Sequence, residues 1–127
     1  MSMKSISQRV VVMGASDNPE RYANQAVRLL QAEGHTVIPV TPRPITLAGL
    51  TVHATLGEVP PPIDTLTLYV NPHLVEILAG EIIAARPGRV IFNPGTEHPA
   101  VAERLRAEGI VTLEACTLVL LRTGQFA

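Results

Sequence analysis

The sequence has few of the residues that stabilise a protein other than through an aliphatic core. It contains one cysteine, Cys116, which cannot form a disulfide within the chain. Only 3% of its residues are aromatic and none is tryptophan. We therefore expect a core of valine, isoleucine, leucine and alanine, a composition typical of a parallel sheet that helices cover on both faces.

Charge of either sign is also scarce. The formal net charge is −1, so the sequence lacks the basic surface that binds duplex nucleic acid. No apolar run reaches the roughly 18 residues that span a bilayer, and no secretory signal is visible. The histidines lack metal-ligand spacing; they are His35, His53, His73 and His98. These absences predict a cytoplasmic protein that binds no metal, nucleic acid or membrane.

Strand and helix patterns alternate along the chain. A length of 127 residues with 46% apolar content fits a single domain over residues 1–127. Buried strands are predicted at Val10–Met13, His35–Val40, Asp64–Tyr69, Arg89–Phe92 and Ile110–Leu113, with a short one near Thr51–Ala54. The alternation predicts an α/β, Rossmann-like fold, a doubly wound, mostly parallel sheet of five or six strands with helices on both faces.

Helix signals occupy the segments between these strands. Asn18 is expected to cap the first helix, with Pro19 in its first position, and Gly34 to end it. A second helix is expected from about His73 to Ala85. Its buried face should carry the apolar residues at helical spacing, which are Leu74, Ile77, Leu78 and Ile82. Leu56–Val59 is expected to form a brief helical turn. A further helix is expected to begin near Pro99.

Candidate binding residues follow the strands, because a doubly wound sheet binds ligands beyond the carboxyl ends of its strands. After the first strand comes the turn Gly14-Ala15-Ser16, which has only the first of the three glycines in the dinucleotide fingerprint. The N-terminus of the following helix would offer N–H groups and partial positive charge to a phosphate. Helix capping alone would also explain these residue types. The other strand ends carry Thr41-Pro42-Arg43, Asn71-Pro72 and Asn93-Pro94-Gly95.

The end of the second strand bears on which nucleotide would bind. Folds that bind NAD usually place an acidic residue there for the ribose hydroxyls, but residues 40–44 contain no carboxylate. Arg43 suits the additional ribose phosphate that NADP and coenzyme A carry, or else it is a solvent-exposed arginine. Because the missing glycines would crowd a dinucleotide pyrophosphate, coenzyme A fits better than NADP.

These segments together resemble a known family. The likeness runs from about Arg9 to Cys116 and is carried by Gly14–Pro19 with Arg21, Gly34–Pro42, Pro62–Asp64, Asn93–Gly95 and Cys116. They are similar to the small stand-alone CoA-binding domain proteins, which look like the nucleotide-binding domain of the succinyl-CoA synthetase α subunit. The resemblance implies a Rossmann-like fold that binds coenzyme A or an acyl-CoA and has no catalysis of its own.

The resemblance also implies a role for each strand end. Gly14-Ala15-Ser16 would meet phosphate, with Arg21 nearby as a cation. Thr41-Pro42-Arg43 would lie along the adenosine phosphate. Val70-Asn71-Pro72 would pack by the adenine or ribose, and Asn93-Pro94-Gly95 would line the pantetheine side.

Catalytic groups are few, and no catalytic residue is predicted. Glu97-His98 is the one acid–base pair near the presumed site, and a polar lead-in to the helix at Pro99 explains it better. Cys116 could form a mixed disulfide with coenzyme A, although free cysteines are more often small buried apolar residues. The chain is too short for a second, substrate-binding lobe. This favours a non-catalytic CoA-binding protein over the alternative, a small NADP- or other nucleotide-linked oxidoreductase.

The apolar tail offers a possible contact with another chain. Residues 113–121 carry few charges and could pack against a second copy or close the sheet of the monomer. The sequence therefore leaves open a homo-oligomer or an unseen protein partner.

Overall fold

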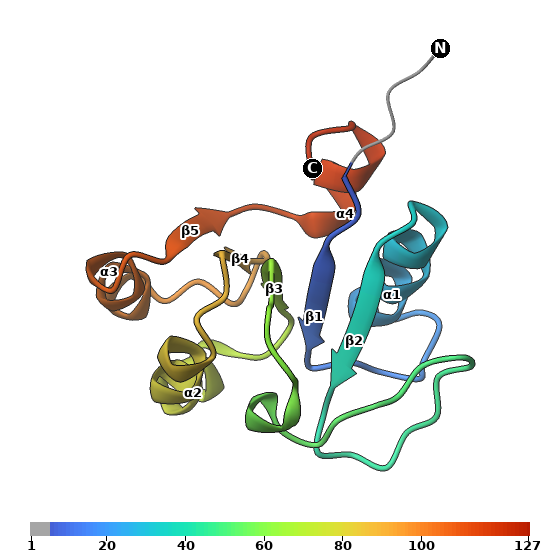
Figure 1. The fold of residues 1–127 in the computed structure, drawn as a ribbon, viewed down its shortest axis with the longest axis horizontal. Coiled ribbons are helices and arrows are strands. Elements are labelled where there is room, and N and C mark those ends of the chain that lie inside the picture. The colour runs from blue at the N-terminus through green and yellow to red at the C-terminus, as the bar shows by residue number, and fades with distance from the viewer. Residues whose placement is uncertain (1–5) are drawn as a thin grey trace.

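The computed structural model describes residues 6–127 as a parallel five-stranded sheet with helices on both faces (Figure 1). The strands, in the sheet order β2-β1-β3-β4-β5, are β1 (Arg9–Met13), β2 (Thr36–Val40), β3 (Thr65–Leu68), β4 (Arg89–Phe92) and β5 (Val111–Glu114). The helices are α1 (Tyr22–Ala32), α2 (Pro72–Ala85), α3 (Pro99–Ala107) and α4 (Thr117–Arg122), and a 3-10 turn, η1 (Leu56–Glu58), precedes β3. The predicted Rossmann-like α/β fold is confirmed.

The sheet separates two layers of aliphatic core. Val11, Leu66 and Val90 face a layer that α2 and α3 complete. Val12 and Ile91 face the opposite layer, which α1 and α4 cover. Because β1 and β4 are buried on both faces, their sequences are largely apolar without alternation. The middle strand β3 is also buried on both faces, but its sequence alternates threonine with leucine, and both threonines are buried.

The strand order reverses direction at β1. The chain leaves β1 through α1 to reach β2 on one side, and then crosses to β3 on the other side of β1. The carboxyl ends of β1 and β3 therefore flank the point where an open α/β sheet forms its binding crevice.

The strand expected near residues 51–54 does not form. His53 alone makes an isolated bridge with Val40. Its N–H donates to the carbonyl of Pro39, and its own carbonyl accepts from the N–H of Thr41. Thr51 is exposed and outside any strand. This segment covers part of the outer edge of β2, and the sheet has five strands.

Helix α1 begins later than the sequence predicts. Asn18 closes a local turn by accepting a hydrogen bond from the N–H of Glu20, and Arg21 occupies the N-cap position of α1. Asn18 and Pro19 therefore lie before the helix and not in its first turn. Residues 14–21 form a longer loop after β1 than expected. Gly34, with φ of +89°, follows the helix in the left-handed conformation that was predicted.

Helix α2 buries only part of the predicted face: Ile82 is buried and Leu78 is half-buried against the core, as expected. Its buried residues are Val75, Ala79 and Ile82, whereas Leu74 is exposed and Ile77 is 64% exposed. Apolar side chains occur all round this helix, so its sequence does not define one face. The packing of α2 against η1 and α3 determines which face is buried.

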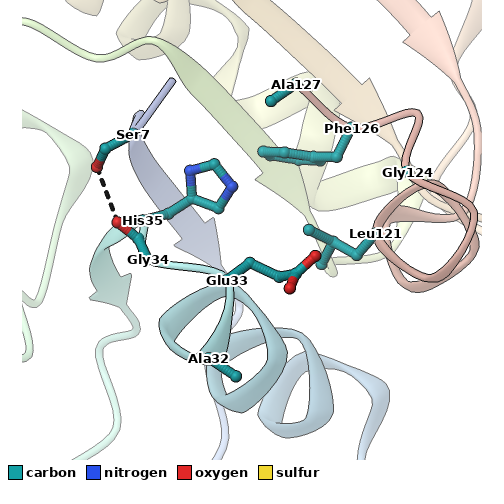
Figure 2. Close-up of a pocket in the computed structure, with 9 residues that line it drawn as sticks. All are labelled: Ser7, Ala32, Glu33, Gly34, His35, Leu121, Gly124, Phe126 and Ala127. Atoms are coloured by element: carbon teal, nitrogen blue, oxygen red, sulfur yellow. Dashed lines mark hydrogen bonds between the residues drawn. The ribbon is translucent and has the colours of Figure 1, made fainter. Parts of the chain in front are cut away.

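The C-terminal segment folds back to the amino-terminal end of the strands, opposite the expected site (Figures 1 and 2). Phe126 is buried there and contacts the His35 ring edge-on, with the Arg89 guanidinium 4.6 Å from its ring centre. Figure 2 shows the cavity that His35 and Phe126 line together with Glu33 and Leu121.

The His35 side chain lies inside the protein. Its side chain is 8% exposed, and its Nδ1 accepts a hydrogen bond from the N–H of Gln8. Burial lowers the pKa of His35, and the positive charge of Arg89 lowers it further, whereas Glu33 raises it.

No helix within residues 6–127 has the length and apolar character needed to cross a membrane.

Candidate functional site

Gly14 brings three strand ends together. It leaves β1 with φ of +88°, which L side chains rarely adopt. A Cβ atom on Gly14 would lie 2.7 Å from the carbonyl oxygen of Tyr69 and 2.9 Å from Cγ1 of Val70. The backbone can pass this close to the end of β3 only because the residue is glycine. The turn thus lies against β3 at the reversal of strand order.

The first two amides of the turn are used inside the protein. The N–H groups of Gly14 and Ala15 both donate to the carbonyl of Val40, at 2.9 and 3.2 Å. They fasten the turn to the end of β2. Within residues 6–127, the N–H groups of Ser16 and Asp17 have no hydrogen-bond partner and remain available.

A small polar network fixes the loop that follows. The buried Asn24 side chain donates to the carbonyl of Ser16, and its oxygen accepts from Arg28, which also donates to the carbonyl of Pro19. The hydroxyl oxygen of Ser16 accepts from the N–H of Asn18, so its own proton is still free to be donated. This network holds Ser16 at the start of α1. Sequence reasoning missed Asn24 and Arg28, although their spacing of four on a helix was a signal.

The N-terminus of α1 has no side-chain cap. Arg21 occupies the N-cap and its side chain is exposed, whereas the Asn71 side chain caps α2 and His98 caps α3. The N–H groups of Tyr22 and Ala23 make no hydrogen bond within residues 6–127. Free N–H groups, the helix dipole and the Arg21 guanidinium therefore all favour an anion beside the loop.

At the end of β2, Thr41 is buried and its hydroxyl accepts from the N–H of Arg43 at 3.3 Å. This local turn sends Pro42 and Arg43 outward, and both are exposed. The Arg43 guanidinium makes no ion pair within the described residues. It can therefore meet a ligand that extends over the end of β2.

At the end of β3, the three predicted residues have different environments. Val70 is half-buried against the core and its side chain lies beside Gly14. Asn71 caps α2 by accepting from the N–H of Leu74, and Pro72 is the first residue of that helix. Asn71 and Pro72 are exposed, so this strand end offers one apolar wall beside polar surface.

Asn93, at the end of β4, is a structural connection between elements. Its side-chain N–H groups donate to the Thr67 hydroxyl and the Leu68 carbonyl, and its oxygen accepts from the N–H of Thr117. The side chain is buried and all three bonds lie between 2.7 and 2.8 Å. Asn93 thus ties β3, β4 and α4 together at the carboxyl end of the sheet, with no side-chain group left for a ligand.

Tyr69 is the unusual member of this polar cluster. Its hydroxyl is buried without a hydrogen-bond partner in the described part of the chain, although the Thr67 and Thr117 hydroxyls, bonded to each other, are close. Burial raises the pKa of Tyr69 to about 12, so the phenol is neutral at physiological pH. Cys116 lies near it as a half-buried free thiol at the N-cap of α4.

The segment after Asn93 supports the capping interpretation of Glu97-His98. Gly95 turns with φ of +92°, and its N–H donates to the Glu97 carboxylate at 2.8 Å. His98 Nδ1 accepts from the N–H of Val101 at the start of α3, and its Nε2 lies 3.5 Å from Glu76. Pro94 and Gly95 are exposed beside this capped turn.

The fold therefore places all the predicted segments along one end of the sheet. Gly14 contacts Val70 directly, its N–H reaches Val40, and Asn93 bonds to the end of β3. Arg21 and Arg43 are exposed and make no ion pair with any of the described residues. Among residues 6–127, no group of three His, Cys, Asp or Glu side chains could hold a metal ion.

Comparison with known proteins agrees with this arrangement. Residues 8–122 match a family described as a CoA binding domain. The protein YneT of Bacillus subtilis (strain 168) is 32% identical over 114 residues, which cover 89% of this chain and 84% of YneT.

Solved structures show the same fold in small and large proteins. The crystal structure of an uncharacterized protein has a TM-score of 0.91 at 36% identity, covering 96% of this chain and all of that one. A dinucleotide-forming acetyl-coenzyme A synthetase from Ca. Korarchaeum cryptofilum has a TM-score of 0.74 at 22% identity; the match covers 85% of this chain and 25% of the enzyme. With its sequence matching from β1 to α4 and its strand ends gathered round Gly14, this chain belongs to the CoA-binding domain family.

Proposed function

We propose that this protein is a non-catalytic binder of coenzyme A, or of an acyl-CoA, which holds the ligand's phosphates at the loop between β1 and α1. The observation that carries the proposal is the group of free hydrogen-bond donors in the loop that follows Gly14. Unpaired N–H groups of Ser16 and Asp17, the Ser16 hydroxyl and the uncapped end of α1 all face the same loop. Membership of the CoA-binding domain family supports the choice of ligand.

The hydrogen bonds divide the loop that begins at Gly14 into a structural part and a part that would bind phosphate. Gly14 and Ala15 shape it, since their amides are bonded to Val40, while Ser16 and the groups after it donate to the phosphate. Arg21 contributes a nearby positive charge. A diphosphate can accept hydrogen bonds from the loop donors and from the Arg21 guanidinium at the same time. It would therefore be held more firmly than by a single amide.

In this proposal, the rest of coenzyme A lies along the remaining strand ends. Thr41-Pro42-Arg43 runs beside the adenosine, with the Arg43 guanidinium on the 3′-phosphate. Val70 supplies an apolar wall to the adenine or ribose, with Asn71-Pro72 at its rim. Asn93-Pro94-Gly95 borders the pantetheine through Pro94 and Gly95, because the Asn93 side chain is occupied within the fold.

We propose no catalysis because the polar side chains near the site already have structural roles. Glu97 and His98 cap the turn and helix at the end of β4, and Tyr69 is a buried neutral phenol. Neither arrangement places a base beside a nucleophile, which acyl transfer through a covalent intermediate would need.

Ligand-dependent melting tests the proposal. Coenzyme A and acetyl-CoA should raise the melting temperature more than NADP, NAD or ATP, because a ligand that binds only the folded state stabilises it. A shift with NADP and none with coenzyme A would instead favour the nucleotide-linked oxidoreductase.

Matched arginine variants test the role of Arg43. Arg43→Ala should weaken the binding of coenzyme A about tenfold, which is the usual contribution of one charge-assisted hydrogen bond. The same variant should bind 3′-dephospho-CoA almost as well as the wild type does. Arg104→Ala, an exposed arginine on α3, is the control and should change neither affinity. Equal weakening of both ligands by Arg43→Ala would contradict the contact with the 3′-phosphate.

A further inference from the structure

The two edges of the sheet are protected to very different degrees. At β2, Pro39 has no N–H, and His53 bonds to the outward carbonyl of Pro39 and the outward N–H of Thr41. Proline and a covering segment are standard means of preventing edge-to-edge pairing. At β5 neither feature is present: its sequence is Val-Thr-Leu-Glu, and no segment of residues 6–127 pairs with its outer side.

The backbone of β5 determines which groups face outward. The N–H of Ala115 donates inward to the carbonyl of Phe92 in β4, so the odd-numbered residues direct their backbone groups toward β4. Thr112 and Glu114 therefore direct theirs outward. These N–H and C=O groups have no partner among the described residues.

The side chains of β5 form two distinct surfaces. Val111 and Leu113 lie on the same face of the sheet as α1 and α4, but these helices do not extend over β5. The two side chains are therefore 60% and 37% exposed. Thr112 and Glu114 lie on the face of α3, where Arg106 donates to the Thr112 hydroxyl at 2.8 Å. Glu114 is exposed and has no ion pair within residues 6–127.

We propose that β5 pairs antiparallel with β5 of a second copy of this chain, about a two-fold axis at Leu113. In this register Thr112 of each copy lies opposite Glu114 of the other, and each pair exchanges two backbone hydrogen bonds. All the outward N–H and C=O groups of both residues are then paired. The two Leu113 side chains meet at the axis, and Val111 lies opposite Ala115 of the other copy.

Charge complementarity favours a second copy of this chain as the partner, in the register that places Thr112 opposite Glu114. The guanidinium of Arg106 lies over Thr112, so pairing Thr112 with Glu114 of the other copy brings a cation and a carboxylate together. The two-fold axis repeats this contact, giving two ion pairs per dimer. A register centred on Thr112 would place the two Arg106 side chains on either side of the axis, where they would repel each other.

The pairing joins two five-stranded sheets into one sheet of ten strands. Because the pair is antiparallel, the Gly14 loops of the two copies lie at opposite ends of the joined sheet. Coenzyme A should therefore bind each copy independently, and the dimer does not depend on the proposed ligand.

Sedimentation of the full chain without ligand tests the proposal over about 5–500 μM, the range suited to a small interface. The wild type should pass from monomer to dimer with rising concentration. Leu113→Lys should weaken dimerisation at least about 100-fold, because it places two charges opposite each other at the axis. Val119→Lys, at a 52% exposed valine on α4, is the matched control and should dimerise as the wild type does.

A charge exchange tests the register. Glu114→Arg and Arg106→Glu should each weaken the dimer about tenfold, and the double variant should regain most of that loss. Circular dichroism of each variant distinguishes misfolding from loss of pairing. A wild type that stays monomeric to 500 μM, a dimer that survives Leu113→Lys, or a double variant no better than its parents would each overturn the proposal.

Discussion

Gly14→Ala tests whether a close backbone approach builds the site. Two separate costs act at this residue: its φ of +88° is unfavourable for any L side chain, and the new methyl group would lie 2.7 Å from the Tyr69 carbonyl oxygen. That oxygen belongs to the backbone and cannot rotate away. The end of β3 must therefore move, or the turn must leave Val40.

The expected loss of stability is the sum of these two costs. A left-handed conformation costs an alanine about 1–2 kcal/mol. Forcing an extra methyl group into packed surroundings costs about 1–3 kcal/mol more. We therefore expect Gly14→Ala to lower the free energy of unfolding by about 2–5 kcal/mol, a large part of the roughly 5–15 kcal/mol of a typical domain.

Two other glycines separate the costs. Gly34 has almost the same φ, +89°, but nothing lies within 4 Å of the position of its Cβ. At Gly88 a Cβ would lie 2.9 Å from the Asp64 carbonyl oxygen, and its φ is outside the positive range. Alanine at Gly34 should show the conformational cost alone, and alanine at Gly88 the steric cost alone.

Urea unfolding of the three variants provides the measurement, since the midpoint and slope give each change in free energy. Gly14→Ala should lose about as much as the other two variants together. If it lost no more than Gly34→Ala, the contact with β3 would have no energetic weight. The absence of a side chain at Gly14 would then not be what fixes this turn.

The other predictions concern buried polar groups. Burial lowers the pKa of His35 in the folded state, so the unfolded state binds more protons as the pH falls. The contribution of neutral His35 to the free energy of unfolding should therefore be fully present above about pH 6.5 and be lost as the pH drops toward the folded pKa. Urea midpoints from pH 8 to 5 should show this slope, and His35→Gln should flatten it; an unchanged slope would assign the proton uptake to other groups. Asn93→Ala should lower the free energy of unfolding by about 2–4 kcal/mol, since it leaves several buried partners unpaired. Tyr69→Phe should be neutral or slightly stabilising, because the Tyr69 hydroxyl has no hydrogen-bond partner among residues 6–127. Thermal unfolding would contradict both assignments if Tyr69→Phe were the more damaging change.

The sequence identified most of the fold because its inner strands are buried on both faces. Runs such as Val10–Met13 and Val90–Phe92 are apolar without alternation, which is characteristic of parallel strands between helices. The segment near His53 misled the same reasoning. Its composition resembles a strand, but it contributes one bridge residue to an edge that Pro39 has already limited.

The candidate site was predicted in outline and not in detail. The carboxyl ends of parallel strands meet at one end of a sheet, so naming the strands was enough to group Gly14, Val70 and Asn93. Which groups remain free for a ligand depended on hydrogen bonds between distant residues. The bonds from Gly14 and Ala15 to Val40, and those that occupy Asn93, have no local signature in the sequence.

By itself, the sequence determined the alternation of β1 to β5 with helices and the likeness to CoA-binding domains, because these follow from local propensities and short motifs. Only the tertiary structure decided which face of α2 is buried, that His35 lies inside, and which edge of the sheet stays open. These properties depend on contacts between residues far apart in the chain. Local patterns are equally compatible with several such packings, and the lowest free energy of the whole assembly selects one of them.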